Sequence, residues 1–502
     1  MPYRMLPTKN LPFSLPVLSG LFLVLCQPPV SLFPLAFVAL TPLLVDIYGR
    51  NLRQSFLRGF VTGLVAFTGL VYWVVVSMNT YGGLSPTLSL LVLALLVSYL
   101  ALYVGFFAWS VTYFQSKGLE SYLTAPLIWV ALEYGRGFLL SGFPWSFLAH
   151  SQQQFLPLIQ IASVTGTYFV SYLLVAVSAI ASFVIRRRTV PWPFFAATTL
   201  LVVISIAFGI NRLQVSEKGD LRTAIIQGNM PQDVKWDADF KAYTIATYRD
   251  LTIQHGGGAA LVLWPETAMP FIFDDDPAQK VISEIPVAVS SPLLFGNISQ
   301  NGLNRYYNSA TALGSDGTVL GTYSKVHLVP FGEFTPLREY FPFLANISVQ
   351  IGDFFSGDSH RPIATGDGAL GVLICFEGVF PTITNETVRR GATVLVNMTN
   401  DAWFGRSSAA YQHLGFYVFR AIETDRWVLR AANTGFSAII DPQGHIRART
   451  GLFEKTALTG HFAMKQSQTF YVRHGDYFMI LVGSAILFFL LYALLPRGSK
   501  KH

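Results

Sequence analysis

Three polar residues lie in or at the end of apolar runs of the sequence, where they could carry chemistry. Cys375 ends the run 369–375, Glu266 follows a similar run, and Lys325 lies in the mostly apolar stretch 323–333. In such a setting a thiol could act as a nucleophile, a carboxylate could accept its proton, and a lysine could neutralise an oxyanion. Each residue also has a plainer interpretation: an inert buried cysteine, a surface glutamate or an edge-strand lysine. Singly, none of them establishes a catalytic site.

The neighbours of these residues do not indicate a metal centre. His327 lies two residues beyond Lys325 and has no companion Cys or His at ligand spacing, so we expect a structural histidine. Cys375 and Cys26 are the two cysteines of the chain, so no disulfide framework is possible. Without companion ligands around His327, we expect no metal site.

Taken together, the order of the three motifs is far more specific than any one of them. The three motifs resemble the Glu-Lys-Cys triad of the nitrilase superfamily. In chain order they are Trp-Pro-Glu at 264–266, Tyr-Ser-Lys at 323–325 with Pro-Phe-Gly-Glu at 330–333, and Ile-Cys-Phe-Glu at 374–377. The whole chain resembles bacterial apolipoprotein N-acyltransferases. This wider resemblance rests on the three motifs together with the segment 227–232 and Trp236, the segment 397–405 and the flanking apolar segments. Phe376 departs from the commoner family pattern, in which tyrosine often follows the cysteine.

The resemblance implies a role for each matching residue. Cys375 would be the acyl-accepting nucleophile, Glu266 the general base and acid, and Lys325 the oxyanion stabiliser together with the backbone N–H of Phe376. Glu333 and Glu377 would be supporting residues that position Lys325 and the neighbouring backbone. Candidate substrate-binding residues are aromatic: Trp236, Phe334, Phe341 and Phe355. The phenylalanines between Lys325 and Cys375 would form apolar loops facing the membrane, or equally a local hydrophobic cluster.

The reaction implied is a ping-pong acyl transfer without a cofactor. A phospholipid would donate its acyl chain to Cys375 as a thioester, and the α-amino group of an S-diacylglyceryl cysteine at the N-terminus of an apolipoprotein would accept it. The implied partners are therefore the phospholipid donor, the apolipoprotein acceptor and membrane lipid, and we expect a monomer.

The composition indicates that one part of the chain lies in a membrane and another part in water. Hydrophobic residues make up 52% of the 502 residues and charged residues 13%, against about a quarter charged in soluble proteins. Acidic residues are nearly absent before residue 217, whereas 215–470 mixes both signs. The net charge is +7, and outside 215–470 the basic residues form short clusters between apolar runs. Membrane topology explains such clusters, so we expect no nucleic acid as a partner.

Eight apolar segments predict an α-helical polytopic membrane bundle. They cover residues 11–27, 30–48, 57–78, 87–114, 121–141, 155–185, 192–211 and 476–495. Basic residues of short loops stay on the cytoplasmic side, and here they occupy alternate loops, as Arg4, Lys9, Arg50, Arg53, Arg58, Lys117, Arg186, Arg187, Arg188, Arg497, Lys500 and Lys501. We therefore predict a multi-pass protein of the bacterial inner membrane, with both termini cytoplasmic and the catalytic domain periplasmic.

The pattern of residues 215–470 predicts an external α/β domain. Its expected strands are 221–227, 260–264, 293–298, 309–313, 369–375, 393–397 and 436–440, and its expected helices are 239–255, 381–390 and 411–432. This pattern, with the resemblance, implies a nitrilase-like αββα sandwich. The expected division is a membrane domain at 1–212, the catalytic domain at 213–472, and a last span with a tail at 473–502.

Two other functions remain open at this point. A membrane-tethered amidase or nitrile hydrolase of the same fold would release ammonia from small amides. A lipid or solute carrier would use the external domain only for binding or regulation, and its spans would work without Cys375.

Overall fold

The computed structural model describes residues 13–235, 237–302, 305–335 and 354–495. The chain forms two compact units. The helical unit takes Met1–Tyr72, Leu91–Asn211 and Asp476–His502, and the α/β unit takes Trp73–Leu90 and Arg212–Gly475. Each unit is described by itself.

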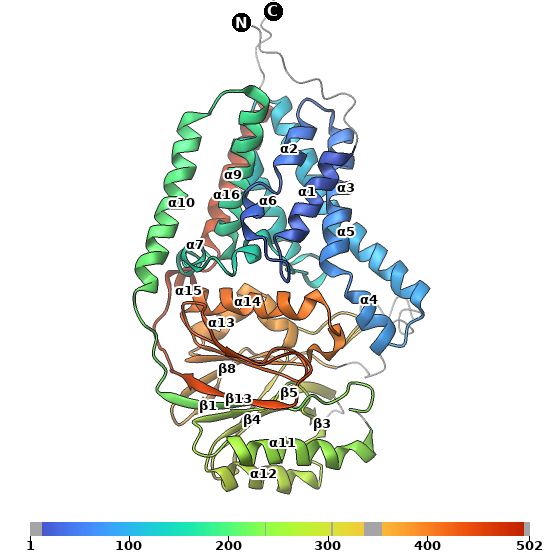
Figure 1. Ribbon diagram of the computed structural model, residues 1–502, viewed down its shortest axis with the longest axis vertical. Coiled ribbons are helices and arrows are strands. Elements are labelled where there is room, and N and C mark those ends of the chain that lie inside the picture. The colour runs from blue at the N-terminus through green and yellow to red at the C-terminus, as the bar shows by residue number, and fades with distance from the viewer. Residues whose placement is uncertain (1–12, 236, 303–304, 336–353, 496–502) are drawn as a thin grey trace, which may run out of the picture. The chain divides into compact units, whose positions relative to one another are not determined.

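The helical unit consists of helices of very different lengths (Figure 1). They are α1 (Ser14–Leu25), α2 (Thr41–Ile47), α3 (Leu52–Val71), α5 (Pro86–Ser116), α6 (Ser121–Arg136), α7 (Leu156–Ile159), α8 (Ala162–Thr165), α9 (Thr167–Arg187), α10 (Trp192–Leu213) and α16 (Tyr477–Leu494). Among the described residues, five helices are long and apolar enough to cross a membrane: α3, α5, α9, α10 and α16.

The remaining expected spans contain shorter helices. α1 has 12 residues, α2 has 7 and α6 has 16. Prolines at 28, 29 and 34 separate the first two helices, because proline cannot continue a helix. The expected segment 155–185 is interrupted at Gly166, whose φ is 74°. The number of eight membrane crossings therefore stays a prediction.

Small residues allow α3 and α5 to pack closely. A Cβ on Gly63 would lie 2.6 Å from the Cα of Ala101, and one on Gly59 would lie 2.3 Å from the main-chain oxygen of Val104. Such small residues four apart are typical of helix contacts inside membranes, where close van der Waals packing replaces the hydrophobic effect. α6 packs along α9, and α16 packs against both of them.

The α/β unit contains two sheets. The first has the order β13-β1-β2-β4-β5-β6, with β3 beside β4, and the second has the order β12-β11-β10-β9-β8-β7. The strands are β1 (Leu221–Gln227), β2 (Leu261–Leu263), β3 (Met269–Ile272), β4 (Leu293–Asn301), β5 (Arg305–Leu313), β6 (Val319–Ser324), β7 (Ile363–Thr365), β8 (Gly368–Ile374), β9 (Val394–Thr399), β10 (Val428–Ala432), β11 (Ala438–Ile440), β12 (Ile446–Arg449) and β13 (Thr456–Phe462).

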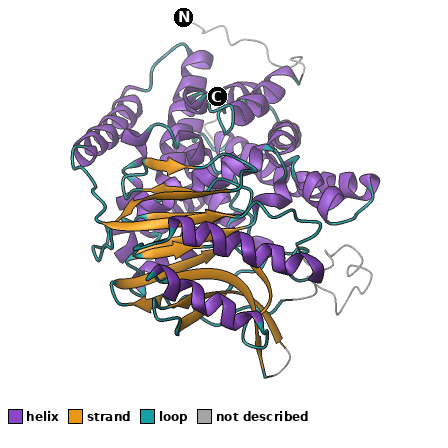
Figure 2. Ribbon diagram, turned by 60° about the horizontal axis from the view of Figure 1, so that its bottom comes forward, coloured by secondary structure: helices purple, strands orange, loops and turns teal. Residues whose placement is uncertain are grey.

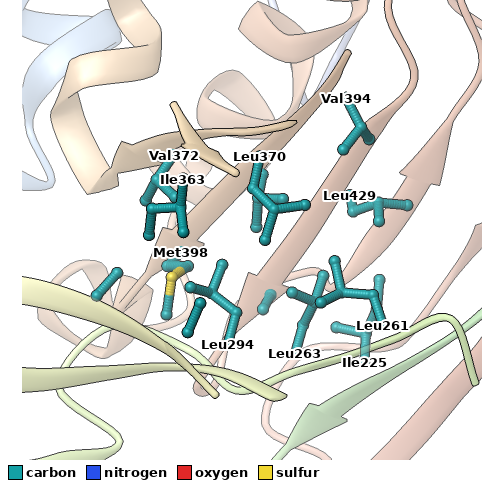
Figure 3. Packing of buried hydrophobic residues seen from close by; sticks show 14 of the residues in the cluster. Ile225, Leu261, Leu263, Leu294, Ile363, Leu370, Val372, Val394, Met398 and Leu429 are labelled. Carbon is teal, nitrogen blue, oxygen red and sulfur yellow. The ribbon is translucent and has the colours of Figure 1, made fainter. Parts of the chain in front are cut away.

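The core of this unit lies between the two sheets (Figure 3). Alternate residues of neighbouring strands meet there, for example Leu261 and Leu263 of β2 with Leu370 and Val372 of β8, because side chains of a strand point to opposite faces in turn. Helices cover the outer faces (Figure 2). α11 (Lys241–His255) and α12 (Ala278–Val289) cover the first sheet, and α13 (Pro381–Arg389) and α14 (Ser408–Thr424) cover the second. The expected αββα sandwich is confirmed.

One predicted helix of this unit is wrong in its second half. The sequence predicts a helix over 411–432, but α14 ends at Thr424, Asp425 has a left-handed φ of 55°, and β10 follows. β10 pairs with β9 and β11 and is buried throughout. A short apolar run buried on both faces has no alternation, so its periodicity does not distinguish a strand from a helix.

Candidate active site

The strand directions of the α/β unit bring the three motif residues to one end of the sandwich. β2 is parallel to β4, and β4 pairs antiparallel with β5, which pairs antiparallel with β6. β2 and β6 therefore end at the same edge, where Glu266 and Lys325 follow them. Cys375 follows β8 of the facing sheet. The ends of the two sheets are joined directly, because the main-chain N–H of Asn400, after β9, donates to Oε2 of Glu266 at 2.9 Å.

Cys375 occupies a strained turn directly after its strand. It has a φ of 51°, a left-handed conformation that is uncommon for a non-glycine residue. The hydroxyl of Tyr417 donates to its main-chain oxygen at 3.0 Å. Burial, followed by the negative charge of Glu266, raises the pKa of the Cys375 thiol, and the charge of Lys325 opposes this shift only in part. At neutral pH the thiol is therefore protonated and needs a proton acceptor before it can attack.

Glu266 is buried, and its carboxylate has fixed partners. Oε1 accepts from Nδ2 of Asn308 at 2.8 Å and lies 3.7 Å from Nζ of Lys325. Oε2 accepts the Asn400 N–H described above. The carboxylate is thus held in one orientation beside the thiol whose pKa it raises.

Lys325 is 1% exposed and its ammonium group is held by carboxylates. Nζ lies 2.9 Å from Oε1 and 2.8 Å from Oε2 of Glu333. Burial alone would lower the pKa of Lys325, but the charges of Glu333 and Glu266 outweigh it and hold the pKa above its ordinary value. Lys325 is therefore a permanent positive charge in a site with little water, where such a charge is most effective on an oxyanion.

Glu377 ties the Lys325 segment to the Cys375 turn. Its Oε1 accepts from the hydroxyl of Tyr323 at 2.8 Å and from the N–H groups of Val326 and His327 at 2.8 and 3.1 Å. Its Oε2 accepts from the N–H of Ile374 at 2.7 Å. The resemblance implied three carboxylates near Lys325, and the structure brings two to its ammonium group and the third to the backbone around it.

The structure describes two of the four aromatic residues predicted for substrate binding, Phe334 and Phe355. Phe334 is half-buried and its main-chain oxygen accepts from the N–H of Phe331 at 2.7 Å. Phe355 is 42% exposed and its ring lies 5.0 Å from the guanidinium carbon of Arg305, on β5. Trp236 and Phe341 lie outside the described residues. The substrate-binding role of all four stays a prediction.

The turn residue Phe376 and the neighbouring His327 form an aromatic contact with Phe380, the residue before α13. Phe376 is 9% exposed, and its ring packs edge-on against Phe380 at 5.0 Å. The ring of His327 lies 4.1 Å from that of Phe380. Burial, followed by the charge of Lys325, lowers the pKa of His327 to about 4. His327 is therefore neutral at pH 7 and packs as an uncharged ring.

The structure adds polar residues that the motifs alone did not single out. Asn308 of β5 bridges the two glutamates, because its Nδ2 lies 2.8 Å from Oε1 of both Glu266 and Glu333. Asn400 lies within the segment 397–405, which the sequence had marked only as part of the resemblance. Asn308 had no such signal, since it becomes a neighbour of Glu266 only through the pairing of β4 with β5.

A buried ionic cluster supports the segment that contains Asn400. Asp401 binds His413 of α14 at 2.9 Å and Arg430 of β10 at 2.6 Å. Although burial alone would raise the pKa of Asp401, the charges of Arg430 and His413 lower it below its usual range. The Asp401 carboxylate is therefore ionised and fixes the turn that presents the Asn400 N–H to Glu266.

Comparison with known proteins assigns the family. Residues 19–180 match the model of the apolipoprotein N-acyltransferase N-terminal domain, and residues 222–470 match the carbon-nitrogen hydrolase model. A Geobacter metallireducens protein named apolipoprotein N-acyltransferase is 42% identical over 94% of this chain and 93% of its own length. The chain belongs to the apolipoprotein N-acyltransferase family.

Other members of the apolipoprotein N-acyltransferase family are also similar over most of the chain. Proteins of that name from Azotobacter vinelandii and Pseudomonas putida are each 31% identical, over 96% and 93% of this chain and 95% and 94% of theirs. Among solved structures, a Nesterenkonia amidase of the nitrilase superfamily matches 53% of this chain and 98% of its own, with 17% identity and a TM-score of 0.38. The relatives and the carbon-nitrogen hydrolase match over 222–470 make the chain an acyltransferase with a nitrilase-like unit, and its long apolar helices fit a membrane protein.

A glycine in this acyltransferase gives a direct test of how the site holds Glu266. A Cβ on Gly296 of β4 would lie 2.4 Å from the main-chain nitrogen of Thr267 and 2.5 Å from the main-chain oxygen of Pro265. Gly296→Ala must therefore displace the turn that contains Glu266. We expect acylation to slow by about 10²-fold, the scale for misplacing a reacting group by 1 Å, as measured by single-turnover acyl-enzyme formation.

The matched control for this glycine is Gly302→Ala at the end of the same hairpin. A Cβ on Gly302 would meet no atom within 4 Å, so this variant should react like wild type. Equal rates for Gly296→Ala and Gly302→Ala would contradict the claim that the turn position controls the reaction.

Proposed function

We propose that this protein transfers a fatty acyl chain from a phospholipid, through a thioester on Cys375, to the α-amino group of an S-diacylglyceryl cysteine at the N-terminus of an apolipoprotein. The observation that carries the proposal is a protonated, half-buried thiol that shares one end of the sandwich with a fixed carboxylate and a permanent ammonium. This is the set of groups that acyl transfer through a cysteine needs.

In the first half-reaction, Glu266 takes the thiol proton as sulfur attacks the ester carbonyl. The new C–S bond forms, the ester C–O bond breaks, and the proton passes to the oxygen of the departing lysophospholipid. Lys325 and the N–H of Phe376 stabilise the oxyanion that forms between these events. Because Lys325 stays charged through its contacts with Glu333, this stabilisation needs no proton transfer.

In the second half-reaction, the α-amino nitrogen of the apolipoprotein attacks the thioester. The C–N bond forms and the C–S bond breaks, while Glu266 removes a proton from nitrogen and returns one to sulfur. Both half-reactions use the same base and the same oxyanion site, because each needs a proton taken from the nucleophile and a negative oxygen stabilised.

The proposed setting is the bacterial inner membrane, with both termini in the cytoplasm and the catalytic unit in the periplasm. The distribution of basic residues between alternate loops supports this orientation. Phospholipid in the surrounding bilayer is the acyl donor, and the enzyme acts as a monomer.

The deciding experiment is to incubate the purified full-length protein with a phospholipid labelled in its acyl chain. We expect a label on the peptide that contains Cys375, cleavable by neutral hydroxylamine as a thioester, and released as an amide when a peptide with an N-terminal diacylglyceryl cysteine is added. A label that never forms, together with ammonia release from small amides, would replace the proposal with an amidase.

A further inference from the structure

Lys235 is a buried lysine whose charge has no direct carboxylate partner in the described part of the chain. The residue is 3% exposed. Its Nζ donates to the main-chain oxygen of Glu266 at 3.2 Å and to Oγ1 of Thr267 at 2.6 Å. Lysine is almost never fully buried unless it is paired, because removing an ammonium group from water is costly. Two neutral acceptors are weak compensation, so a role outside stability is the better explanation.

The position of Lys235 places Glu266 between two buried ammonium groups. Lys325 approaches the carboxylate, with 3.7 Å between Nζ and Oε1, whereas Lys235 binds the main chain of the same residue. The two lysines differ in their partners. Lys325 is held by Glu333, whereas the charged group that acts on Lys235 is Glu266 itself.

The turn that Lys235 binds needs support. Thr267 has a φ of 43°, and a β-branched residue in this region is strained. The two hydrogen bonds from Lys235 span Glu266 and Thr267 and therefore hold the strained peptide in place. The segment that contains Lys235 is also linked to the Glu266 carboxylate through Asn400. Oε1 of Gln232 accepts from Nδ2 of Asn400 at 2.6 Å, and the Asn400 N–H donates to Glu266.

We propose that Lys235 is a positioning residue for acyl transfer, whose ammonium group fixes the Glu266–Thr267 turn and keeps a second positive charge beside the base. This inference rests on the proposed function for its substrate and on the geometry of the turn for its mechanism. The two hydrogen bonds hold the main chain of the residue that accepts the thiol proton, and the ammonium charge lies beside it.

The charge on Lys235 can be titrated in an accessible range. Burial lowers the pKa of Lys235 to about 8, against the opposing charge of Glu266. Its charge is therefore lost as the pH rises through about 8. The folded protein disfavours the charged form, so burying Lys235 costs stability fully below about pH 8, and this cost fades as the pH rises towards the ordinary pKa of 10.5. Replacing Lys235 by a neutral residue should therefore not unfold the protein.

The test compares full-length wild type with Lys235→Met in the first half-reaction with labelled phospholipid, between about pH 6 and pH 10. We expect Lys235→Met to form acyl-enzyme about 10²-fold more slowly at pH 7, with a Tm no lower than that of wild type. The wild-type rate should also show a decrease centred near pH 8 that Lys235→Met lacks. Lys235→Arg, which keeps the charge, should be faster than Lys235→Met at pH 7.

Lys465→Met is the matched control, because Lys465 pairs with Glu217 and Asp425 and does not contact Glu266. It should leave both the rate and its pH profile unchanged. A wild-type rate for Lys235→Met, an unchanged pH profile, or a loss of rate explained by a lower Tm would each overturn the proposal.

A second readout separates this proposal from the proposed function. The rate of Cys375 alkylation by iodoacetamide, located by mass spectrometry, requires no phospholipid. If wild type forms no acyl-enzyme, the acyl-transfer function fails, yet a change in alkylation rate and pH profile in Lys235→Met would still support its effect on Glu266 and the thiol. Identical alkylation of the two proteins would exclude that effect.

Discussion

Acyl-enzyme formation from phospholipid is expected to disappear when Cys375 is replaced by alanine. Cys375 is the proposed acceptor of the acyl chain, and loss of the nucleophile in a comparable catalytic triad lowers the rate by about 10⁶-fold. Serine at this position should also fail, because its hydroxyl is far less acidic than a thiol and a weaker nucleophile. The measurement is the amount of hydroxylamine-sensitive label per protein molecule.

The control for Cys375→Ala is Cys26→Ala, which removes the other cysteine of the chain. Cys26 is fully buried in the helical unit, so this variant should be labelled like wild type. A labelled thioester that survives in Cys375→Ala would refute the assignment of the nucleophile, and a normal lipoprotein phenotype with Cys375→Ala would favour the carrier interpretation.

The second large effect is expected from Glu266→Gln. Glutamine keeps the size of the side chain and one carbonyl acceptor for the Asn400 N–H, but it cannot take a proton. Loss of a positioned general base costs about 10²- to 10⁴-fold, and both half-reactions should slow, because Glu266 serves in each. Single-turnover acyl-enzyme formation and release of the acyl-enzyme by an acceptor peptide measure the two steps separately.

The residual rate of Glu266→Gln is expected to increase with pH. Burial raises the pKa of the Cys375 thiol, and the charge of Glu266 raises it further. Without the base, the thiol must ionise on its own, so the residual rate should increase steadily with pH. The matched control is Glu284→Gln on the exposed face of α12, which should behave like wild type. Wild-type rates in Glu266→Gln would mean that another group accepts the proton.

The site is held together by contacts that cross between the two sheets. Glu377, after β8, binds the backbone that follows β6, and Asn400, after β9, binds Glu266, which follows β2. Each contact joins a strand end of one sheet to a strand end of the other. Movement of the sheets against each other would therefore separate Cys375, Glu266 and Lys325, and the buried polar partners of these residues oppose such movement.

Residues near the end of α3 also support the site from within the α/β unit. Ser77 Oγ donates to the main-chain oxygen of Trp403 at 2.7 Å, and the rings of Trp73 and Phe404 are 4.8 Å apart. Trp403 and Phe404 belong to the turn that begins with Asn400 and Asp401. The sequence placed residues 57–78 in a single span, whereas residues after Tyr72 pack with the catalytic unit.

The sequence by itself determined the chemical groups and most of the elements that carry them. Apolar runs before Glu266 and Cys375 located two of the strand ends, since burial of a strand requires such runs and a reactive side chain must leave the core at their end. The strand before Lys325, β6, was not predicted. The strand 221–227 was predicted at its observed bounds. The order of the three motifs then indicated the family, which the relatives confirm.

Only the tertiary structure decided which other groups surround the triad. Asn308, Asn400 and Lys235 are distant in sequence from the residues they bind, and contacts between sheets and loops leave no local periodicity. The same limit explains β10, which was predicted as helix because a strand buried on both faces shows no alternation. Local patterns report which face of an element is buried, whereas the partner across the core depends on how the sheets pair and pack.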